Sequence, residues 1–270
     1  MVEHENFRPL RLHTARYRAH TTNAALCVHS AGRREPAPAD HEPDRLGEEL
    51  NNVDPHFWHN RWIRNEVGFH QGEVNPHLRE YWICLDPLPE ETVFVPLCGK
   101  AHDLAWLREQ GHAVVGVELS PVACRDFFTE RGIEPSVESD ERFTRYFHDG
   151  IELWCGDYFE LSAGNVPNID LIYDRAALIA LPEAMRQRYV AHLTALSREG
   201  TRTLLITLDY PPQDFQGPPF AVGDDEVRDH YAATHELTRL HHQRIPADDP
   251  LAQRGLIDAT ESVFRMRKRR

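Results

Sequence analysis

The chain has 270 residues, 41% of them hydrophobic, and its 43 acidic residues outnumber its 30 Lys and Arg, which gives a formal net charge of −13. This length is enough to bury a sizeable core in one α/β domain with room for an appendage. The negative charge disfavours nucleic acid and anionic membrane surfaces as partners, and no run of 18 or more apolar residues predicts a membrane span.

Cysteine and histidine usage predicts a reduced protein without a metal site. The cysteines are odd in number and form no C-x-x-C motif: Cys27, Cys84, Cys98, Cys124 and Cys155. This favours free thiols in a cytoplasmic protein over a disulfide framework or a zinc ribbon. The 17 histidines are scattered and form no recognisable ligand set, so we predict no metal.

The first 50 residues differ from the rest of the chain. Residues 1–34 carry six Arg and two Glu, whereas residues 35–50 carry one Arg and six acidic residues. Hydrophobic periodicity is absent, and three prolines interrupt any element. A transit peptide is an alternative, but amphipathic pattern and cleavage signal are both missing. We predict a disordered extension over 1–52, or a start codon placed too early, followed by one folded domain over 53–270.

Ordered structure is expected to begin near Asp54. The Asp54-Pro55 pair is typical of a helix N-cap and first helical residue. On that helix an apolar face is expected from Phe57, Trp58, Trp62 and Ile63, with Gly68 ending it and residues 69–71 (Phe-His-Gln) forming a loop. We interpret Trp58 as a core residue. A second helix is predicted around residues 78–82, before two prolines.

Residues 93–118 are the best-defined unit of the chain. An apolar run from Val93 to Leu97 predicts a strand buried on both faces, and a turn through Gly99 leads into a helix that Gly111 ends. A second apolar run, 113–117, ends at Glu118, which completes a parallel β-α-β unit. A carboxylate 19 residues after Gly99 suits a ribose diol, because it accepts hydrogen bonds from both hydroxyls. A solvated strand end is the alternative, and Glu118 would then be dispensable.

The turn itself distinguishes between nucleoside ligands. A dinucleotide site needs the glycines of G-x-G-x-x-G for close approach to a pyrophosphate. This turn has one glycine, preceded by Pro96, Leu97 and Cys98, so it is poorly suited to phosphate. S-adenosylmethionine (SAM) has a ribose and an adenine but no phosphate, and it tolerates an apolar loop.

The remaining elements follow in α/β order. A helix is predicted from Ser120-Pro121, and a hairpin over 143–155 turns at Asp149-Gly150. Further strands are predicted at 169–173, 203–209, 236–245 and 259–266. Helices are predicted around 185–196 and 225–234, with a proline-rich loop at 210–220 as a pocket wall. The basic last six residues are interpreted as a frayed tail.

Two further positions lie just past predicted strands. Asp157 and Tyr158 follow the hairpin, at the strand ends that line the ligand crevice of a doubly wound sheet, although an ordinary turn is the alternative. Arg175 follows the strand at 169–173, in a chain with only two lysines. A functional cation and a surface salt bridge are comparable interpretations for Arg175.

Eight motifs in order resemble the thiopurine S-methyltransferase family, particularly its bacterial branch. They span residues 57 to 266, about four-fifths of the chain, and read FWHNRW, VGFHQ, VNPHL, VPLCGK, GVELS, LWCGD, YDRAALIAL and TLDY…GPPF. The resemblance implies a class I SAM-dependent methyltransferase, with a Rossmann-like, mostly parallel seven-stranded sheet and an N-terminal helical cap. It implies a cytoplasmic monomer that acts on a small molecule in detoxification.

The resemblance also implies roles for single residues. The cofactor positions fall on Trp62, Leu97, Glu118, Asp157, Tyr158 and Arg175, and the aromatic position that covers cofactor and substrate falls on Phe69. An arginine near the C-terminus helps thiopurine binding in some members, and Arg254 is the candidate here.

The chemistry expected from these residues is methyl transfer to a soft nucleophile. In-line displacement at a sulfonium needs no metal and little acid–base work when the acceptor is already an anion. Arg175, always charged, is a candidate partner for a thiolate. We therefore expect a thiol methyltransferase, with selenium or tellurium compounds as further acceptors. Alternatives are a non-catalytic SAM-binding module, a methyltransferase for another soft nucleophile and, more weakly, a NAD-dependent oxidoreductase.

Overall fold

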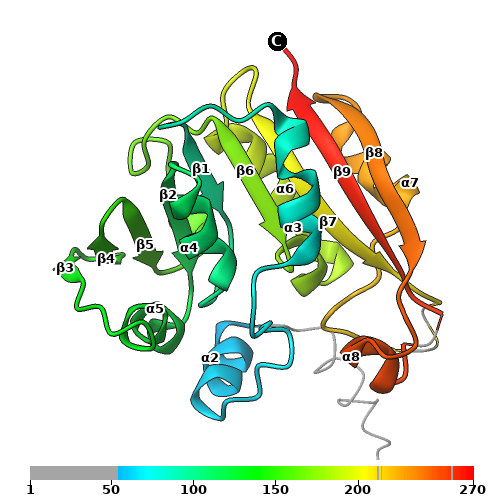
Figure 1. Cartoon of the computed structure of the whole chain (residues 1–270), viewed down its shortest axis with the longest axis horizontal. Helices are drawn as coiled ribbons and strands as arrows, with labels where there is room; N and C mark the ends of the chain where they lie inside the picture. Colours follow the sequence, from blue (N-terminus) through cyan, green and yellow to red (C-terminus); the bar gives the residue numbers. More distant parts are fainter. Residues whose placement is uncertain (1–53, 212, 214, 257) are drawn as a thin grey trace, which may run out of the picture. The chain divides into compact units, whose positions relative to one another are not determined.

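A computed structural model describes residues 54–211, 213, 215–256 and 258–270 of the chain. The predicted extension over residues 1–52 lies outside this part. The described residues contain one nine-stranded sheet with the order β3-β4-β5-β2-β1-β6-β7-β9-β8 (Figure 1). The expected α/β architecture is confirmed, although the sheet has two strands more than the seven expected.

The centre of the sheet is parallel. It consists of β5 (Ile151–Cys155), β2 (Ala113–Glu118), β1 (Thr92–Val95), β6 (Leu171–Arg175) and β7 (Arg202–Asp209). Alternate side chains of β1 enter opposite cores, with Phe94 in one and Val93 and Val95 in the other. This is the predicted strand buried on both faces, and the predicted β-α-β unit is confirmed.

Antiparallel strands extend the sheet at both edges. β4 (Thr144–His148) pairs with β5 through a turn in which Asp149 has φ +43° and Gly150 φ +76°, as predicted for a hairpin. β3 (Ser136–Ser139) adds a further strand, which was not predicted because all four of its residues are exposed. β9 (Thr260–Lys268) and β8 (His235–Arg244) complete the other edge. Four of the eight pairings among described strands are therefore antiparallel, so the mostly parallel description holds only for the centre.

Helices cover both faces of the sheet (Figure 1). One face packs against α3 (Pro76–Tyr81), the 3₁₀ turn η1 (Trp82–Leu85), α4 (His102–Glu109) and α5 (Pro121–Thr129). The other face packs against α6 (Glu183–Leu196) and α7 (Asp224–Tyr231). Short turns η2 (Tyr158–Glu160) and η3 (Leu178–Ala180) and the helix α8 (Pro250–Gln253) follow strand ends. The predicted helices are confirmed in type and order.

The first described helix, α2 (Pro55–Ile63), is capped as predicted: the Asp54 side chain accepts a hydrogen bond from the Phe57 N–H at 2.9 Å. It ends at Ile63, where Asn65 takes a left-handed conformation (φ +54°), so the prediction that Gly68 ends it is wrong. Ile63 is 70% exposed and does not join the apolar face.

The C-terminal segment is ordered rather than frayed. The Lys268 ammonium donates to the carbonyls of Thr194 and Ser197 at the end of α6, at 2.6 and 2.7 Å. The Arg269 N–H donates to the Thr234 carbonyl. The Lys268 side chain therefore satisfies carbonyls at a helix end, a role that the basic run in the sequence does not reveal.

Candidate functional site

The predicted site residues gather where three parallel strands end. β1 lies between β2 and β6, and the chain leaves β1 through α4 but leaves β6 through α6, on the opposite face. The carboxyl edge between β1 and β6 is therefore the topological switch point, at which doubly wound sheets bind ligands. In Figure 1, α2 and α8 lie at this edge.

Glu118 is the anchor of this edge. Its two carboxylate oxygens accept hydrogen bonds from the Gly99 and Ser120 N–H groups, each at 2.8 Å. The residue is only 6% exposed, so the solvated strand-end interpretation is wrong. Burial raises the pKa of Glu118, while hydrogen bonds from the Ser120, Gly99 and Leu119 backbone oppose the shift. Each oxygen keeps a second lone pair for a further donor.

The turn after β1 closes against an aromatic ring. Leu97 (φ +46°) and Gly99 (φ +54°) both have left-handed backbones. A Cβ on residue 99 would stand 3.1 Å from Cζ2 of Trp62, so glycine is needed for conformation and for contact. Trp62 is itself buried. The turn and the first helix are thus joined directly at the switch point.

An aromatic cluster continues from Trp62. The Phe69 ring lies 5.5 Å from Trp62 at 78° and 5.6 Å from Trp58 at 81°, both edge-to-face. Trp58 is half-buried and lies outside the buried core clusters, so its interpretation as a core residue is wrong. Together Trp58, Trp62 and Phe69 form what we call the aromatic cap.

Arg175 ends β6 and is half-buried. Within the described part of the chain its guanidinium has no carboxylate partner, which leaves the surface salt-bridge interpretation without support. The preceding Asp174 is fully buried and accepts a hydrogen bond from the Tyr189 hydroxyl at 2.8 Å. Burial raises the pKa of Asp174 to about 6. Arg175 is therefore a cation at the switch point, available to a ligand.

Asp157 and Tyr158 follow β5. Asp157 is exposed, and its side chain accepts a hydrogen bond from the Phe159 N–H at 2.9 Å. Tyr158 is 3% exposed, packs on Tyr189, and donates its hydroxyl to the Tyr189 carbonyl. Burial raises the pKa of Tyr158. The Tyr158 side chain belongs to the core, so a ligand contact at this residue has to come from its backbone.

His70 lies beside the aromatic cap and was not predicted to matter. Its ring stacks on His102 at 5.6 Å and 26°, and the Arg131 guanidinium donates to His102 Nδ1 at 2.9 Å. Burial, and secondly the charge of Lys100, lower the pKa of His70 to about 4. His70 is neutral at physiological pH. The sequence signal was its place after Phe69, although nothing there revealed the cations around it.

Arg254 approaches the same loop from the C-terminal half. Its Nη1 lies 3.0 Å from the position that a Cβ on Gly68 would take. Arg254 itself is exposed, in the turn that follows α8. The sequence left its correspondence open, and the structure brings it next to the loop that carries Phe69.

The proline-rich loop after β7 packs onto the same half of the edge. The Phe220 N–H donates to the Ile179 carbonyl at 2.7 Å, and the Tyr210 hydroxyl donates to the Pro219 carbonyl at 2.6 Å. A small apolar cluster joins this loop to the segment around α8; its buried members are Leu208, Tyr210, Ile245, Leu256 and Ala259. The cluster holds the loop and α8 together.

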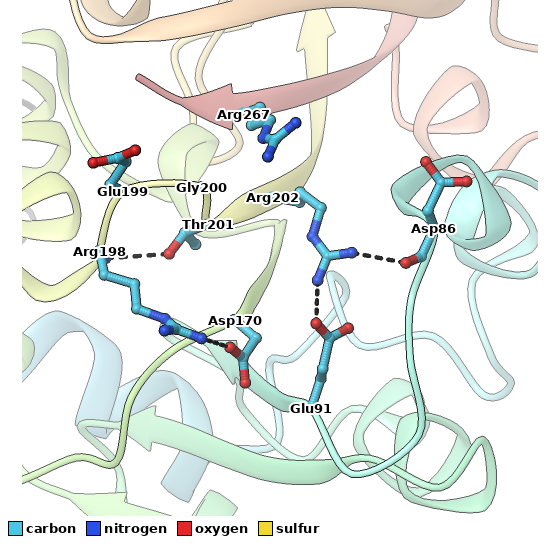
Figure 2. A pocket seen from close by; sticks show the side chains of 9 residues that line it. All are labelled: Asp86, Glu91, Asp170, Arg198, Glu199, Gly200, Thr201, Arg202 and Arg267. Carbon is cyan, nitrogen blue, oxygen red and sulfur yellow. Dashed lines mark hydrogen bonds and ion pairs between the residues drawn. The ribbon is translucent and has the colours of Figure 1, made fainter. Parts of the chain in front are cut away.

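A polar cavity of about 400 Å³ lies at the opposite, amino edge of the strands (Figure 2). Nine residues line it: Asp86, Glu91, Asp170, Arg198, Glu199, Gly200, Thr201, Arg202 and Arg267. Figure 2 shows Arg202 bound to Glu91 and to the Asp86 carbonyl, and Arg198 bound to Asp170. These pairs tie strand starts together and leave this cavity without the features of a catalytic site.

The described residues contain neither a candidate membrane span nor a candidate metal cluster. No helix there is long and apolar enough to cross a membrane. No group of three or more His, Cys, Asp or Glu residues in the described ranges is arranged to hold a metal ion.

Comparison with known proteins gives both a family and a fold. The family described as thiopurine S-methyltransferase matches residues 53–269. Proteins named thiopurine S-methyltransferase from Marinobacter nauticus and Azotobacter vinelandii are 51% and 47% identical to the chain, over 79% of the chain and 98% of each relative. One from Pseudomonas fluorescens is 45% identical over 78% of the chain and 96% of the relative.

Solved structures with low identity share the fold. The 1,6-didemethyltoxoflavin-N1-methyltransferase of Burkholderia thailandensis is 17% identical and has a TM-score of 0.55, covering 87% of this chain and 94% of that one. The magnesium protoporphyrin IX methyltransferase of Synechocystis is 14% identical with a TM-score of 0.55, covering 80% and 100%. The expected methyltransferase fold is confirmed.

Proposed function

The chain belongs to the thiopurine S-methyltransferase family, and on that premise we propose that it methylates the sulfur of aromatic and heterocyclic thiols. It is a SAM-dependent methyltransferase. Two structures that share its fold, from Burkholderia thailandensis and Synechocystis, hold bound S-adenosylhomocysteine.

The residues at the switch point fit this cofactor. Glu118 is fixed by two backbone N–H groups and retains acceptor capacity for a ribose diol. The turn around Leu97 is apolar, as suits a nucleoside without phosphate, and Trp62 closes over Gly99. When bound, SAM supplies an electrophilic methyl group on a sulfonium. The fixed carboxylate beneath the aromatic cap is the observation that carries the proposal.

We assign the remaining roles by position. Trp62, Leu97, Glu118 and Arg175 hold the cofactor. Asp157 and the Tyr158 backbone contact the adenine, and Phe69 covers the substrate. Flat aromatic acceptors suit the edge-to-face rings of the aromatic cap.

The acceptor is expected to arrive as an anion. Glu118 and Asp174 are already hydrogen-bonded, and the Nδ1 atom of His102 is occupied by Arg131. His70, with a pKa of about 4, is a poor base for a thiol with a pKa near 8.5, since a gap of about 4.5 pKa units costs roughly 6 kcal/mol. Arg175 instead stabilises an acceptor that is already ionised. Oxyanions of selenium or tellurium meet the same requirement and make detoxification the proposed role.

The decisive experiment is a turnover screen with methyl-labelled SAM against aromatic thiols, aliphatic thiols, selenite and tellurite. We expect label in the aromatic thioethers. Binding of SAM without turnover of any acceptor would favour the alternative, a non-catalytic SAM-binding module, and turnover of phenols or amines alone would contradict the thiol proposal. We further propose a cytoplasmic monomer, in keeping with the free thiols of Cys84, Cys98, Cys124 and Cys155.

A further inference from the structure

Asp103 is a buried carboxylate in the first turn of α4, and it has no role in the proposed function so far. Its side chain belongs to a residue that is only 2% exposed. Its Oδ1 atom accepts a hydrogen bond from the Asn75 N–H at 2.8 Å, and its Oδ2 atom accepts one from the Tyr173 hydroxyl at 3.0 Å. The two oxygens therefore bind two different parts of the chain.

On one side Asp103 holds the loop that belongs to the aromatic cap. Asn75 ends this loop, and its side-chain carbonyl caps α3. The side-chain amide of Asn75 donates to Gln71 Oε1 at 3.0 Å, inside the same loop. Phe69 lies two residues before Gln71. The position of Asn75 thus bears on the whole segment that carries Phe69.

The first turn of α4 also contacts the beginning of this loop. The ring of His102, the residue before Asp103, stacks on that of His70 at 5.6 Å and 26°. Adjacent residues of one helical turn therefore hold the loop at His70 and at Asn75. The same helix follows directly on the turn around Gly99, which is bonded to the cofactor anchor Glu118.

On the other side Asp103 is bonded to β6. Tyr173 is fully buried and lies two residues before Arg175 on this strand, so both side chains are on the same face of the sheet. Burial and then the charge of Asp103 raise the pKa of the Tyr173 hydroxyl, and the charge of Arg175 opposes them, in keeping with a guanidinium on that face. Asp103 is accordingly a two-bond link between the loop of Phe69 and the strand of Arg175.

A carboxylate is a costly choice for this place if only packing is needed. Burying it is unfavourable unless its oxygens find donors, whereas an apolar side chain of similar volume has no such cost. The two hydrogen bonds offset the cost only while Asn75 and Tyr173 are both in position. The carboxylate therefore favours one placement of the loop relative to β6.

We propose that Asp103 is a positioning residue for methyl transfer, which fixes the loop that carries Phe69 relative to the strand that carries Arg175. This role rests on the proposed function, in which Phe69 covers the acceptor and Arg175 stabilises its charge. Without the link the two groups lose their relative placement, and a displacement of about 1 Å costs up to about 100-fold in rate. The anchor at Glu118 is held by other bonds, so SAM affinity is retained.

Steady-state kinetics with an aromatic thiol at saturating SAM test this role. Tyr173→Phe removes only the bond to β6 and should lower kcat/KM about 3–10-fold, and Asp103→Leu removes both bonds and should lower it about 10–100-fold, mostly in kcat. Asp103→Asn should stay within about threefold of the wild type, because its carbonyl accepts from Asn75 and its amide donates to the Tyr173 oxygen. The Kd of SAM should change less than about threefold in all three variants.

Thr201→Val is the matched control for the loss of a buried hydroxyl. Thr201 is 2% exposed, and its hydroxyl donates to the Ile169 carbonyl at 2.9 Å at the amino edge of the strands. The control should lose stability but keep kcat/KM within about twofold of the wild type. If Tyr173→Phe likewise loses stability and keeps kcat/KM, the bond is merely structural and the positioning role is overturned.

Hydrogen exchange of the ligand-free, full-length protein, read by mass spectrometry, tests the link independently of turnover. We expect faster exchange over residues 69–75 in Asp103→Leu, a smaller increase in Tyr173→Phe, and wild-type rates in Asp103→Asn and Thr201→Val. Unchanged exchange in folded Asp103→Leu would refute the link, and if this variant does not fold, Tyr173→Phe decides. A wild-type protein that methylates no acceptor would contradict the proposed function, while the exchange rates would still decide whether Asp103 holds the loop.

Discussion

Replacing Glu118 by alanine tests the site and the fold together. If Glu118 were a solvated strand end, the substitution would leave the unliganded protein as stable as the wild type. The carboxylate is instead buried, and it accepts the N–H groups of Gly99 and Ser120 at 2.8 Å. Glu118→Ala therefore leaves two backbone donors without their partner, at the turn after β1 and at the start of α5.

The size of the effect follows from these two bonds. Each hydrogen bond to a charged acceptor contributes about 1.5–3 kcal/mol, so the pair is worth roughly 3–6 kcal/mol. The substitution also relieves the desolvation that raises the pKa of Glu118, which reduces the net loss to about 2–4 kcal/mol. In a domain of this size we expect Tm to fall by roughly 5–15 °C. SAM affinity should fall by a further 1–3 kcal/mol or so if the carboxylate holds the ribose.

Thermal unfolding with and without SAM separates the two losses. The control is Glu141→Ala, which removes an exposed carboxylate with no hydrogen bond to another described residue, and whose Tm should stay within about 2 °C of the wild type. Ligand-free Glu118→Ala melting with the wild type would show that the two backbone bonds do not hold the turn. Unchanged SAM affinity in a correctly folded variant would remove Glu118 from the cofactor site.

Four further outcomes are expected. Arg175→Ala should lower kcat/KM more for thiols that are ionised at the assay pH than for neutral thiols, and Arg175→Lys should not fully restore kcat/KM. Equal losses of kcat/KM for both acceptor classes would contradict an anion-binding role. Lys268→Met should lower the free energy of unfolding by about 1–2 kcal/mol, since two carbonyls at the end of α6 lose their donor. Denaturant unfolding measures this free energy, and an unchanged value would restore the frayed-tail interpretation. His235 is 4% exposed, and burial lowers its folded pKa to about 4 from 6.5, so its contribution to stability is lost as pH falls through this window, by up to about 3 kcal/mol. Asp174, whose folded pKa is raised to about 6 from 3.8, has the opposite effect, because its contribution to stability is lost as pH rises between those values. The difference in Tm between wild type and His235→Gln across pH 4–7 therefore isolates the effect of His235. Curves of Tm against pH that run parallel for the two proteins would contradict the assignment. Deleting residues 1–52 should leave Tm and SAM affinity nearly unchanged, and a large fall in either would show that the extension supports the domain.

The sequence pattern predicted those strands and turns whose formation depends mainly on the residues within them. The apolar run from Val93 and the run that ends at Glu118 became β1 and β2, because strands buried on both faces have few alternatives. Asp149 and Gly150 predicted their hairpin for a similar reason, since both adopt the positive φ of a tight turn. Glu118 and Arg175 were predicted as site residues because strand ends converge at one edge, and both do end parallel strands there.

Features set by distant partners were missed. β3 has no apolar alternation and exists because β4 offers it an edge to pair with. The basic C-terminal run resembles a solvated tail until the end of α6 is placed beside Lys268. His70 was visible as a loop residue, but the burial and the nearby Lys100 that lower its pKa are set by tertiary structure. Propensity and periodicity carry no information about such pairs.

The distribution of charge is compatible with capture of the proposed anionic acceptor by an acidic protein. The net charge of −13 repels a thiolate at long range, but salt screens this repulsion beyond about 8–10 Å. Within that distance the acceptor meets the guanidinium of Arg175, which has no carboxylate partner among the described residues, and that of Arg254 beside Gly68. On the proposed function, local cations therefore determine binding, and the overall charge mainly slows the encounter. Moderate salt should speed capture of anionic acceptors until it also screens Arg175, so association is expected to pass through a maximum with ionic strength.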